Sequence, residues 1–168
     1  MKKIFLGIVF MVLAGCQQQK IGFVDNVKLM DEYQEKIDIE KKYETMSQAH
    51  NQKRDSISQA FQMEAQAFQQ KAQSMSQQKA QEEYGNLQQR GQRIGQQLQQ
   101  EEQQMQQQGQ TEMDSLITKV KAQIQKYGKD NGYDYILGGG NGGSVLYGND
   151  SKDLTEEILK LLNANYSK

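Results

Sequence analysis

Proline and tryptophan are absent from this 168-residue chain, and cysteine and histidine each occur once. A single cysteine excludes an intrachain disulfide, and one histidine with one cysteine excludes a metal cluster built from those residue types. The carboxylates alternate with lysines along predicted helix faces, which is typical of solvated surface rather than of an acid/base pair. We therefore expect no enzymatic activity, no metal and no cofactor, and we expect the protein to act by binding.

Apolar area is also scarce. Charged residues make up 24% of the chain, and the mean hydropathy is −0.88. Such a composition supplies little apolar surface for one compact core, so an elongated molecule is expected.

The lack of proline matters most between Asn26 and Tyr127, where apolar residues recur at the three-and-four spacing of a helix. Arg54, Glu64 and Lys71 interrupt the stripe of the outgoing half, so loose packing is expected there. The outgoing helix is predicted from Leu29, Met30, Tyr33, Ile37, Tyr43, Met46, His50, Ile57, Phe61, Phe68, Ala72 and Met75. In this stripe the lone histidine is a polar seam residue.

A returning helix is predicted after a turn. The turn is placed in Ser74–Gly85, with Tyr84-Gly85-Asn86 as its signal. Glutamine supplies 13 of the 26 residues from 85 to 110. A disordered low-complexity tract is therefore the alternative, but the apolar residues keep helical spacing and favour a helix. They step by four and three, with a one-residue slip near Gly109, through Leu87, Gly91, Ile94, Leu98, Glu101, Met105, Met113, Ile117, Val120, Ile124 and Tyr127.

Short strand-like segments flank the helical region. Residues 20–25 predict one strand, and residues 133–137 and 144–147 predict two more, joined as a hairpin by the glycine-rich loop 138–143. That loop lacks the Lys-Ser/Thr ending of a phosphate loop and precedes no helix, so a plain hairpin loop is favoured. A capped amphipathic helix is predicted from Asp153. Three strands and one helix are marginal alone, so oligomerisation is expected to close the open edges.

The first sixteen residues resemble a bacterial lipoprotein signal. A basic start precedes the apolar run Ile4–Val12, which is too short for a permanent membrane span, and the motif Leu13, Ala14, Gly15 then leads into Cys16. The resemblance implies cleavage before Cys16 and acylation of its sulfur. The alternative is a small buried residue in a retained helix.

Four regions follow from these patterns. They are a signal peptide at 1–15, a lipidated linker at 16–19, a β-rich body from 20–30 and 128–168, and a coiled-coil helical hairpin at 31–127. Removal of the signal leaves 18 basic against 21 acidic residues, a formal charge of −3. This sign argues against nucleic acid as a partner.

The order of elements resembles the Skp/OmpH family of periplasmic chaperones. The resemblance rests on the strand Ile21–Asp25, the helix from Asn26, the long hairpin, the strands at 133–137 and 145–147, and the closing Lys152-Asp153-Leu154-Thr155. It implies an α+β, mostly α fold in which a long antiparallel helical hairpin, or tentacle, projects from a small β body. It also implies that the body closes into a β-barrel on trimerisation and that three tentacles hold unfolded outer-membrane proteins without ATP. Basic tentacles are usual in the family, whereas residues 26–84 here carry eight basic and ten acidic residues.

We accordingly expect an ATP-independent holdase for unfolded outer-membrane proteins, lipid-anchored, facing the periplasm and homotrimeric. The outer membrane is favoured because Gln17 is not acidic. The candidate client contacts are Phe61, Met63, Phe68, Met75 and Met105, with filling of the interhelical seam as the alternative role for each. A lipid-anchored coiled-coil spacer of the cell envelope is the competing hypothesis, and a regulator or assembly subunit is a weaker third.

Overall fold

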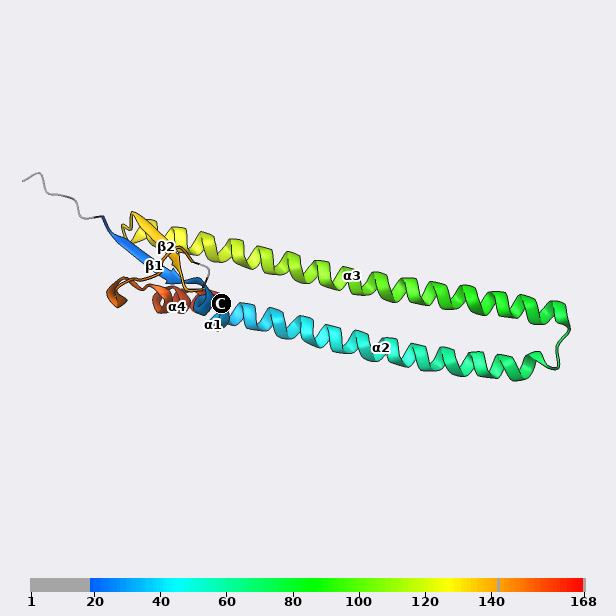
Figure 1. Cartoon of the computed structure of the whole chain (residues 1–168). Coiled ribbons are helices and arrows are strands. Elements are labelled where there is room, and N and C mark those ends of the chain that lie inside the picture. Colours follow the sequence, from blue (N-terminus) through cyan, green and yellow to red (C-terminus); the bar gives the residue numbers. More distant parts are fainter. Residues whose placement is uncertain (1–18, 142, 168) are drawn as a thin grey trace, which may run out of the picture.

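The computed structural model describes residues 19–141 and 143–167, and both Cys16 and the predicted signal peptide lie outside these ranges. A small body lies at one end of the molecule, and a long helical hairpin extends from it (Figure 1). The elements in chain order are β1 (Ile21–Asp25), α1 (Asn26–Glu32), α2 (Gln34–Ala72), α3 (Gln77–Asp130), β2 (Tyr135–Gly139), a 3-10 turn (Asp150–Lys152) and α4 (Thr155–Tyr166). The predicted α+β, mostly α class with a projecting antiparallel hairpin is confirmed.

The two hairpin helices have 39 and 54 residues, so they are about 60 and 80 Å long at 1.5 Å per residue. The chain reverses between Ala72 and Gln77, where Ser76 caps α3 by accepting a hydrogen bond from the Lys79 amide. The predicted turn signal Tyr84-Gly85-Asn86 is wrong because it lies inside α3. A helix tolerates an interior glycine at a modest cost, so glycine alone does not end it.

The predicted continuous helix from Asn26 is interrupted once, at Tyr33. This buried residue has an extended backbone, with φ of −73° and ψ of 118°, and separates α1 from α2. The first amide of α2, that of Gln34, donates to Oδ1 of Asn163 in α4 over 3.0 Å. A side chain of the body therefore caps the outgoing arm, which fixes where the arm begins.

The strands β1 and β2 pair in parallel, in a register that runs from Ile21 opposite Tyr135 to Asp25 opposite Gly139. Parallel neighbours need a long crossover connection, and here the whole helical hairpin supplies it. The predicted strand hairpin at 133–147 is therefore wrong. Residues 144–147 add only an isolated bridge between Gly139 and Val145.

Gly140 is a position in the glycine-rich loop after β2 that requires glycine. Gly140 has a φ of +78°, and a Cβ there would lie 2.2 Å from Oδ1 of Asp25. The Asp25 carboxylate is fixed in this position, because the same Oδ1 accepts hydrogen bonds from the amides of Val27 and Lys28 and so caps α1. The loop is thus fitted against the start of α1.

A single hydrophobic core joins the body to the base of the hairpin. Its buried members come from β1, α1, α4 and the body-proximal ends of α2 and α3. They are Val24, Leu29, Tyr33, Ile39, Leu116, Val120, Leu154, Ile158, Leu159 and Leu162. Beyond Ile39 and Leu116, toward the turn, no hydrophobic residue of either arm is fully buried in the described structure.

Candidate binding surface of the helical arms

The two arms touch along a narrow seam in which aromatic rings of α2 lie on glycines of α3. A Cβ at Gly91 would lie 2.9 Å from Cζ of Phe61, and one at Gly109 would lie 3.3 Å from Cδ1 of Tyr43. These two glycines therefore allow close approach of the helices, and each ring fills the space that a side chain would occupy.

This geometry predicts opposite consequences for two glycines of α3. A Cβ at Gly95 would have no neighbouring atom within 4 Å, whereas Gly91 faces Phe61. We expect Gly95→Ala to raise the free energy of unfolding by about 0.5–1 kcal/mol, the usual difference between alanine and glycine in a helix. Gly91→Ala gains the same propensity but displaces a ring, so it is expected to be less stable than Gly95→Ala. Urea unfolding followed by circular dichroism measures both, and equal stabilisation by the two variants would contradict the seam geometry.

Ion pairs join the arms at intervals of eleven residues. Lys42 pairs with Glu112 and Lys53 with Glu101, each over 2.7 Å, and Arg90 pairs with Glu64. The members on α2 stand at 42, 53 and 64, and those on α3 stand at 90, 101 and 112. Eleven residues make three turns at 3.67 residues per turn, which is close to the period of a straight α-helix. The same face therefore returns every three turns along both arms.

The buried side of α3 follows the same spacing. Leu116 is 2% exposed whereas Ile117 is 37% exposed, so the predicted seam position Ile117 is wrong. The expected slip near Gly109 disappears once the repeat is eleven rather than seven residues. The repeated positions that are buried or half-buried are Leu87, Leu98, Gly109 and Val120, and Ile94, Met105, Leu116 and Tyr127.

Hydrogen bonds from Lys42 and Tyr43 lower the pKa of Glu112, and a hydrogen bond from Lys53 is the main cause that lowers the pKa of Glu101. A carboxylate whose pKa is lower in the folded than in the unfolded chain adds stability above its ordinary pKa of 4.5. That stability is lost as the pH falls through the folded value. The arms are solvent-exposed here, so screening keeps each contribution small.

We therefore expect the melting temperature of the hairpin to fall as the pH is lowered below about 4.5. A Lys42→Met, Lys53→Met variant should show a flatter dependence, because Glu101 and Glu112 then lose their cations. Thermal melts followed by circular dichroism between about pH 3 and 6 measure this. Parallel curves for the two proteins would show that the ion pairs between the arms do not contribute to the pH dependence of the melting temperature.

The five candidate client contacts do not share one environment. Met63 lies on the outer side of α2 and is 65% exposed. Phe61 lies on Gly91 and so has the geometry of a seam filler. Phe68, Met75 and Met105 are half-buried. Met63 is thus the most accessible of the five.

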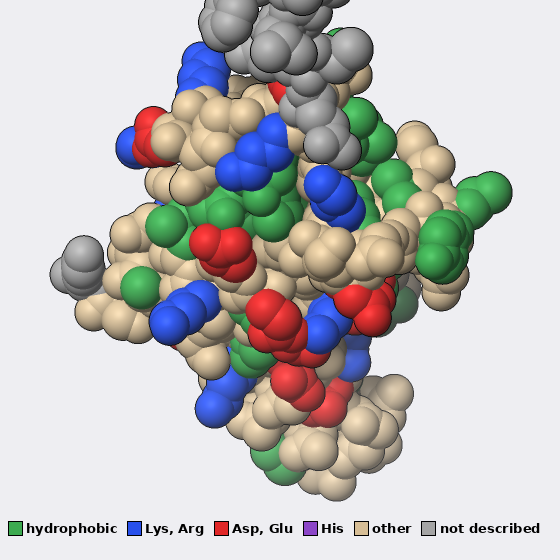
Figure 2. Space-filling view, turned by 90° about the vertical axis from the view of Figure 1, so that its left-hand side faces the viewer, with side chains coloured by type: hydrophobic (Ala, Val, Ile, Leu, Met, Phe, Trp, Pro, Cys, Tyr) green, Lys and Arg blue, Asp and Glu red, His purple; other side chains and the backbone are tan. Residues whose placement is uncertain are grey.

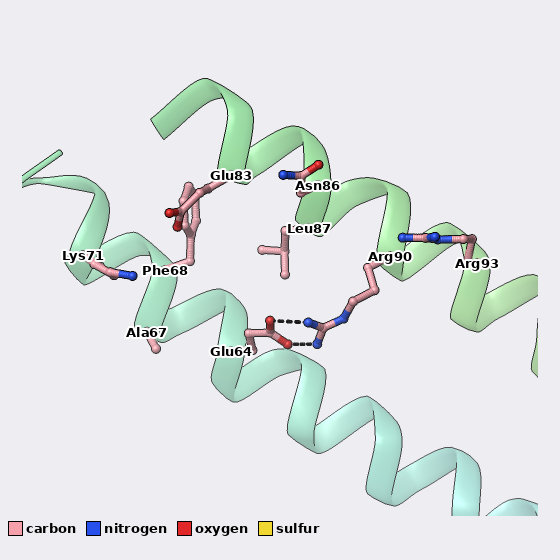
Figure 3. Close-up of a pocket in the computed structure, with 9 residues that line it drawn as sticks. All are labelled: Glu64, Ala67, Phe68, Lys71, Glu83, Asn86, Leu87, Arg90 and Arg93. Carbon is pink, nitrogen blue, oxygen red and sulfur yellow. Dashed lines mark hydrogen bonds and ion pairs between the residues drawn. The ribbon is translucent and has the colours of Figure 1, made fainter. Parts of the chain in front are cut away.

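An open groove of about 470 Å³ lies between the arms near their turn. Figure 3 shows Phe68 of α2 and Leu87 of α3 directed into the space between the helices, and the paired side chains of Glu64 and Arg90 bridging it. The ring of Phe68 stacks on that of Tyr84, with centroids 6.2 Å apart and planes 25° apart. The complete lining is Glu64, Ala67, Phe68, Lys71, Glu83, Asn86, Leu87, Arg90 and Arg93.

Two residues of this groove were predicted from the sequence, Phe68 as a client contact and Leu87 as a seam residue. Tyr84, which is 52% exposed and stacks on Phe68, was not predicted as part of it, and neither were Arg90 and Arg93. In an antiparallel hairpin, the residue numbers of facing positions have a constant sum. Phe68 and Tyr84 have the same sum as Phe61 and Gly91, so a correctly placed turn would have predicted that Tyr84 faces Phe68.

A polar cluster fixes the base of the arms on the body. The Tyr33 hydroxyl donates to Glu35, Nζ of Lys119 lies 2.5 Å from the same carboxylate, and the Tyr166 hydroxyl donates to Asp38 over 2.9 Å. Burial raises the pKa of Tyr33 well above its ordinary value, with the neighbouring Glu35 adding to the effect. The cluster joins α2, α3 and α4, so the direction of the arms is set by the body.

Large apolar side chains remain on the surface of the body. Leu146 and Tyr147 are 98% and 88% exposed, and Tyr135 and Leu137 on β2 are exposed as well. Figure 2 views the molecule from the body end and shows hydrophobic side chains at several places on this surface. A body that exposes such side chains offers them to a partner surface.

Charge is balanced along the arms. Residues 34–127 contain 12 basic and 12 acidic residues. Within residues 19–141 and 143–167 no cluster of three or more His, Cys, Asp or Glu side chains could hold a metal ion. No helix of the described chain has the length and apolar character needed to span a membrane. His50 lies in the seam, with Nε2 3.2 Å from the carbonyl oxygen of Leu98.

Comparison with known proteins identifies relatives. A family model described as an outer membrane protein (OmpH-like) matches residues 20–162. Among solved structures, one described as a candidate outer membrane chaperone (OmpH-like) from Caulobacter crescentus CB15 aligns with a TM-score of 0.76 at 15% sequence identity. The alignment covers 88% of this chain and 85% of that one. No curated protein matches the chain.

Proposed function

The chain belongs to the OmpH-like family of outer membrane proteins, and on that basis we propose that it is an envelope chaperone that holds unfolded outer-membrane proteins without ATP. The observation that carries the proposal is the pair of long arms, which extend from the body and contact one another along the seam. The described relative from Caulobacter crescentus has the same fold. The protein acts by binding rather than by catalysis.

The surface of the arms suits weak and adaptable holding. An unfolded outer-membrane barrel exposes alternating apolar strands that aggregate edge to edge. The arms and the turn between them offer half-buried Phe68, Met75 and Met105 and exposed Met63 within a glutamine-rich wall of balanced charge. Methionine adapts to many shapes. With 12 basic and 12 acidic residues in the arms, apolar contact is favoured over capture by net charge.

The working form in this proposal is a homotrimer whose bodies share a closed β-barrel. One edge of β1 is covered where the Leu154 amide donates to the Phe23 carbonyl over 2.9 Å. The far edge of β2 is bridged at Gly139 by Val145, and in the described chain no other strand lies beside it. An open edge with apolar neighbours recruits a further strand. A second copy supplies one.

Attachment to the membrane rests on Cys16, which lies outside the described residues. We propose that lipidation of Cys16 tethers the chaperone with its arms in the periplasm, most simply at the outer membrane. Cys16→Ser is expected to move the protein from the membrane to the soluble fraction, because the acylated sulfur is lost. Fractionation of cells that express either form tests this, and unchanged membrane association of the variant would refute the lipid anchor.

The holding activity is tested by dilution of a urea-denatured outer-membrane barrel protein into buffer that contains the soluble form starting at Gln17. We expect light scattering to be suppressed without ATP at about one trimer per client, as for a binder of the unfolded state. An unrelated globular protein at equal mass is the control. No suppression would overturn the proposal and would favour the lipid-anchored spacer.

A further inference from the structure

The groove near the turn combines an apolar floor with an aromatic platform. Phe68 and Leu87 face the space between the arms (Figure 3), and Tyr84 stacks on Phe68 while remaining 52% exposed. Nearer the body, Phe61 on Gly91 and Tyr43 on Gly109 fill the seam at those two positions. The groove near the turn is open at its surface, so a segment of another chain can lie along it over the paired Glu64 and Arg90.

The charges of the groove leave one positive charge uncompensated. Glu64 and Arg90 bind each other through two hydrogen bonds. The three other charged residues of the lining are Lys71, Glu83 and Arg93, and none of them forms an ion pair with another described residue. Two cations therefore stand against one carboxylate. An occupant that carries a carboxylate is complementary to this balance.

The length of the groove sets the size of its occupant. Glu83 and Arg93 mark its two ends on α3 and are ten residues apart, which is about 15 Å along a helix. An extended chain covers that distance in four or five residues at about 3.3 Å per residue. Phe68 and Leu87 lie between these ends (Figure 3).

We infer that this groove binds an extended segment of four or five residues that has an aromatic or branched apolar side chain at its centre and a carboxylate directed to Arg93. The inference rests on the proposed holding function, since the segment belongs to the unfolded client. The apolar side chain lies on Phe68 and Leu87, and the carboxylate pairs with Arg93 at the end nearer the body. The groove is then a site of defined chemistry within an otherwise unspecific surface.

The test uses the full soluble chain and a fluorescein-labelled pentapeptide of alternating sequence, with phenylalanine at its centre and aspartate at one end. A second peptide has asparagine in place of aspartate. Fluorescence anisotropy at low salt is expected to show at least fivefold tighter binding of the aspartate peptide. Arg93→Gln should abolish that difference. Arg54→Gln, which removes an exposed arginine of α2 outside the groove, should leave it unchanged.

A second variant tests the aromatic platform. Tyr84→Ser removes an exposed ring, so the helix remains folded, and it is expected to weaken both peptides by about the same factor. Equal affinity of the two peptides for the unaltered protein, or an unchanged difference in Arg93→Gln, would overturn the inference. If the unaltered protein suppresses client aggregation while these peptide results fail, the groove is refuted and the holding function stands. If aggregation is not suppressed at all, the holding function itself fails.

Discussion

Excision of Tyr43–Lys53 from α2 together with Glu102–Glu112 from α3 is expected to leave a folded hairpin whose arms are about 16 Å shorter. Each deletion removes eleven residues, so the remaining parts of both helices keep their rotational phase within about 20°. Lys42 then takes the place of Lys53 and faces Glu101. The aromatic contact of Phe61 with Gly91 is retained, because both residues lie beyond the cut.

The matched control removes nine residues from each arm, Tyr43–Asn51 and Gln104–Glu112. Nine residues are two and a half helical turns, so the distal parts of both arms rotate by about 180° and turn their apolar stripes outward. We expect this variant to lose helical circular dichroism, whereas the eleven-residue excision melts within a few degrees of the intact protein. Small-angle scattering measures the arm length. Equal loss of helix in both variants would refute the eleven-residue repeat.

The prediction of the hairpin from the sequence depends on the same periodic spacing of seam residues that this experiment tests. Helical arms were predictable because their seam residues are local in sequence and recur with a helical period. Leu87, Leu98 and Met105 were placed correctly. Ile117 was not, because a seven-residue repeat was imposed where the ion pairs and buried positions repeat every eleven.

The body was harder to predict because its contacts are distant in sequence. The register of β1 with β2 joins Ile21 to Tyr135, and no local pattern marks such a pairing. Residues 144–147 are rich in strand-forming types, which favoured a local hairpin, but only Val145 bridges to β2. In the groove near the turn, Tyr84 was likewise assigned to a turn from a local pattern, that of Tyr84-Gly85-Asn86. Its stacking on Phe68 depends on the position of the chain reversal.

A Leu146→Asp, Tyr147→Asp variant is expected to be a folded monomer, whereas the unaltered protein is expected to sediment as the proposed trimer. The two side chains are 98% and 88% exposed in one chain, so their replacement removes nothing from the core of a protomer. In the proposed trimer they are covered by the neighbouring body. Full burial of a side chain of this size contributes about 1.5–3 kcal/mol, and a buried unpaired aspartate opposes assembly further.

Sedimentation velocity with Met63→Asp as the control separates this effect from a general effect of added charge. Met63 is also exposed, at 65%, but it lies on an arm, so its replacement should leave the trimer intact. A monomer for Leu146→Asp, Tyr147→Asp with unchanged circular dichroism would locate assembly at residues 146 and 147. A trimer for that variant would instead leave the open edge of β2 as the contact, because main-chain pairing there needs neither side chain.

Since the arms touch the rest of the described chain only near their base, loss of the trimer would separate the hairpins of the three copies from one another without altering any one of them. Aggregation assays on the monomer would then show whether a client is held by one hairpin or needs several around it.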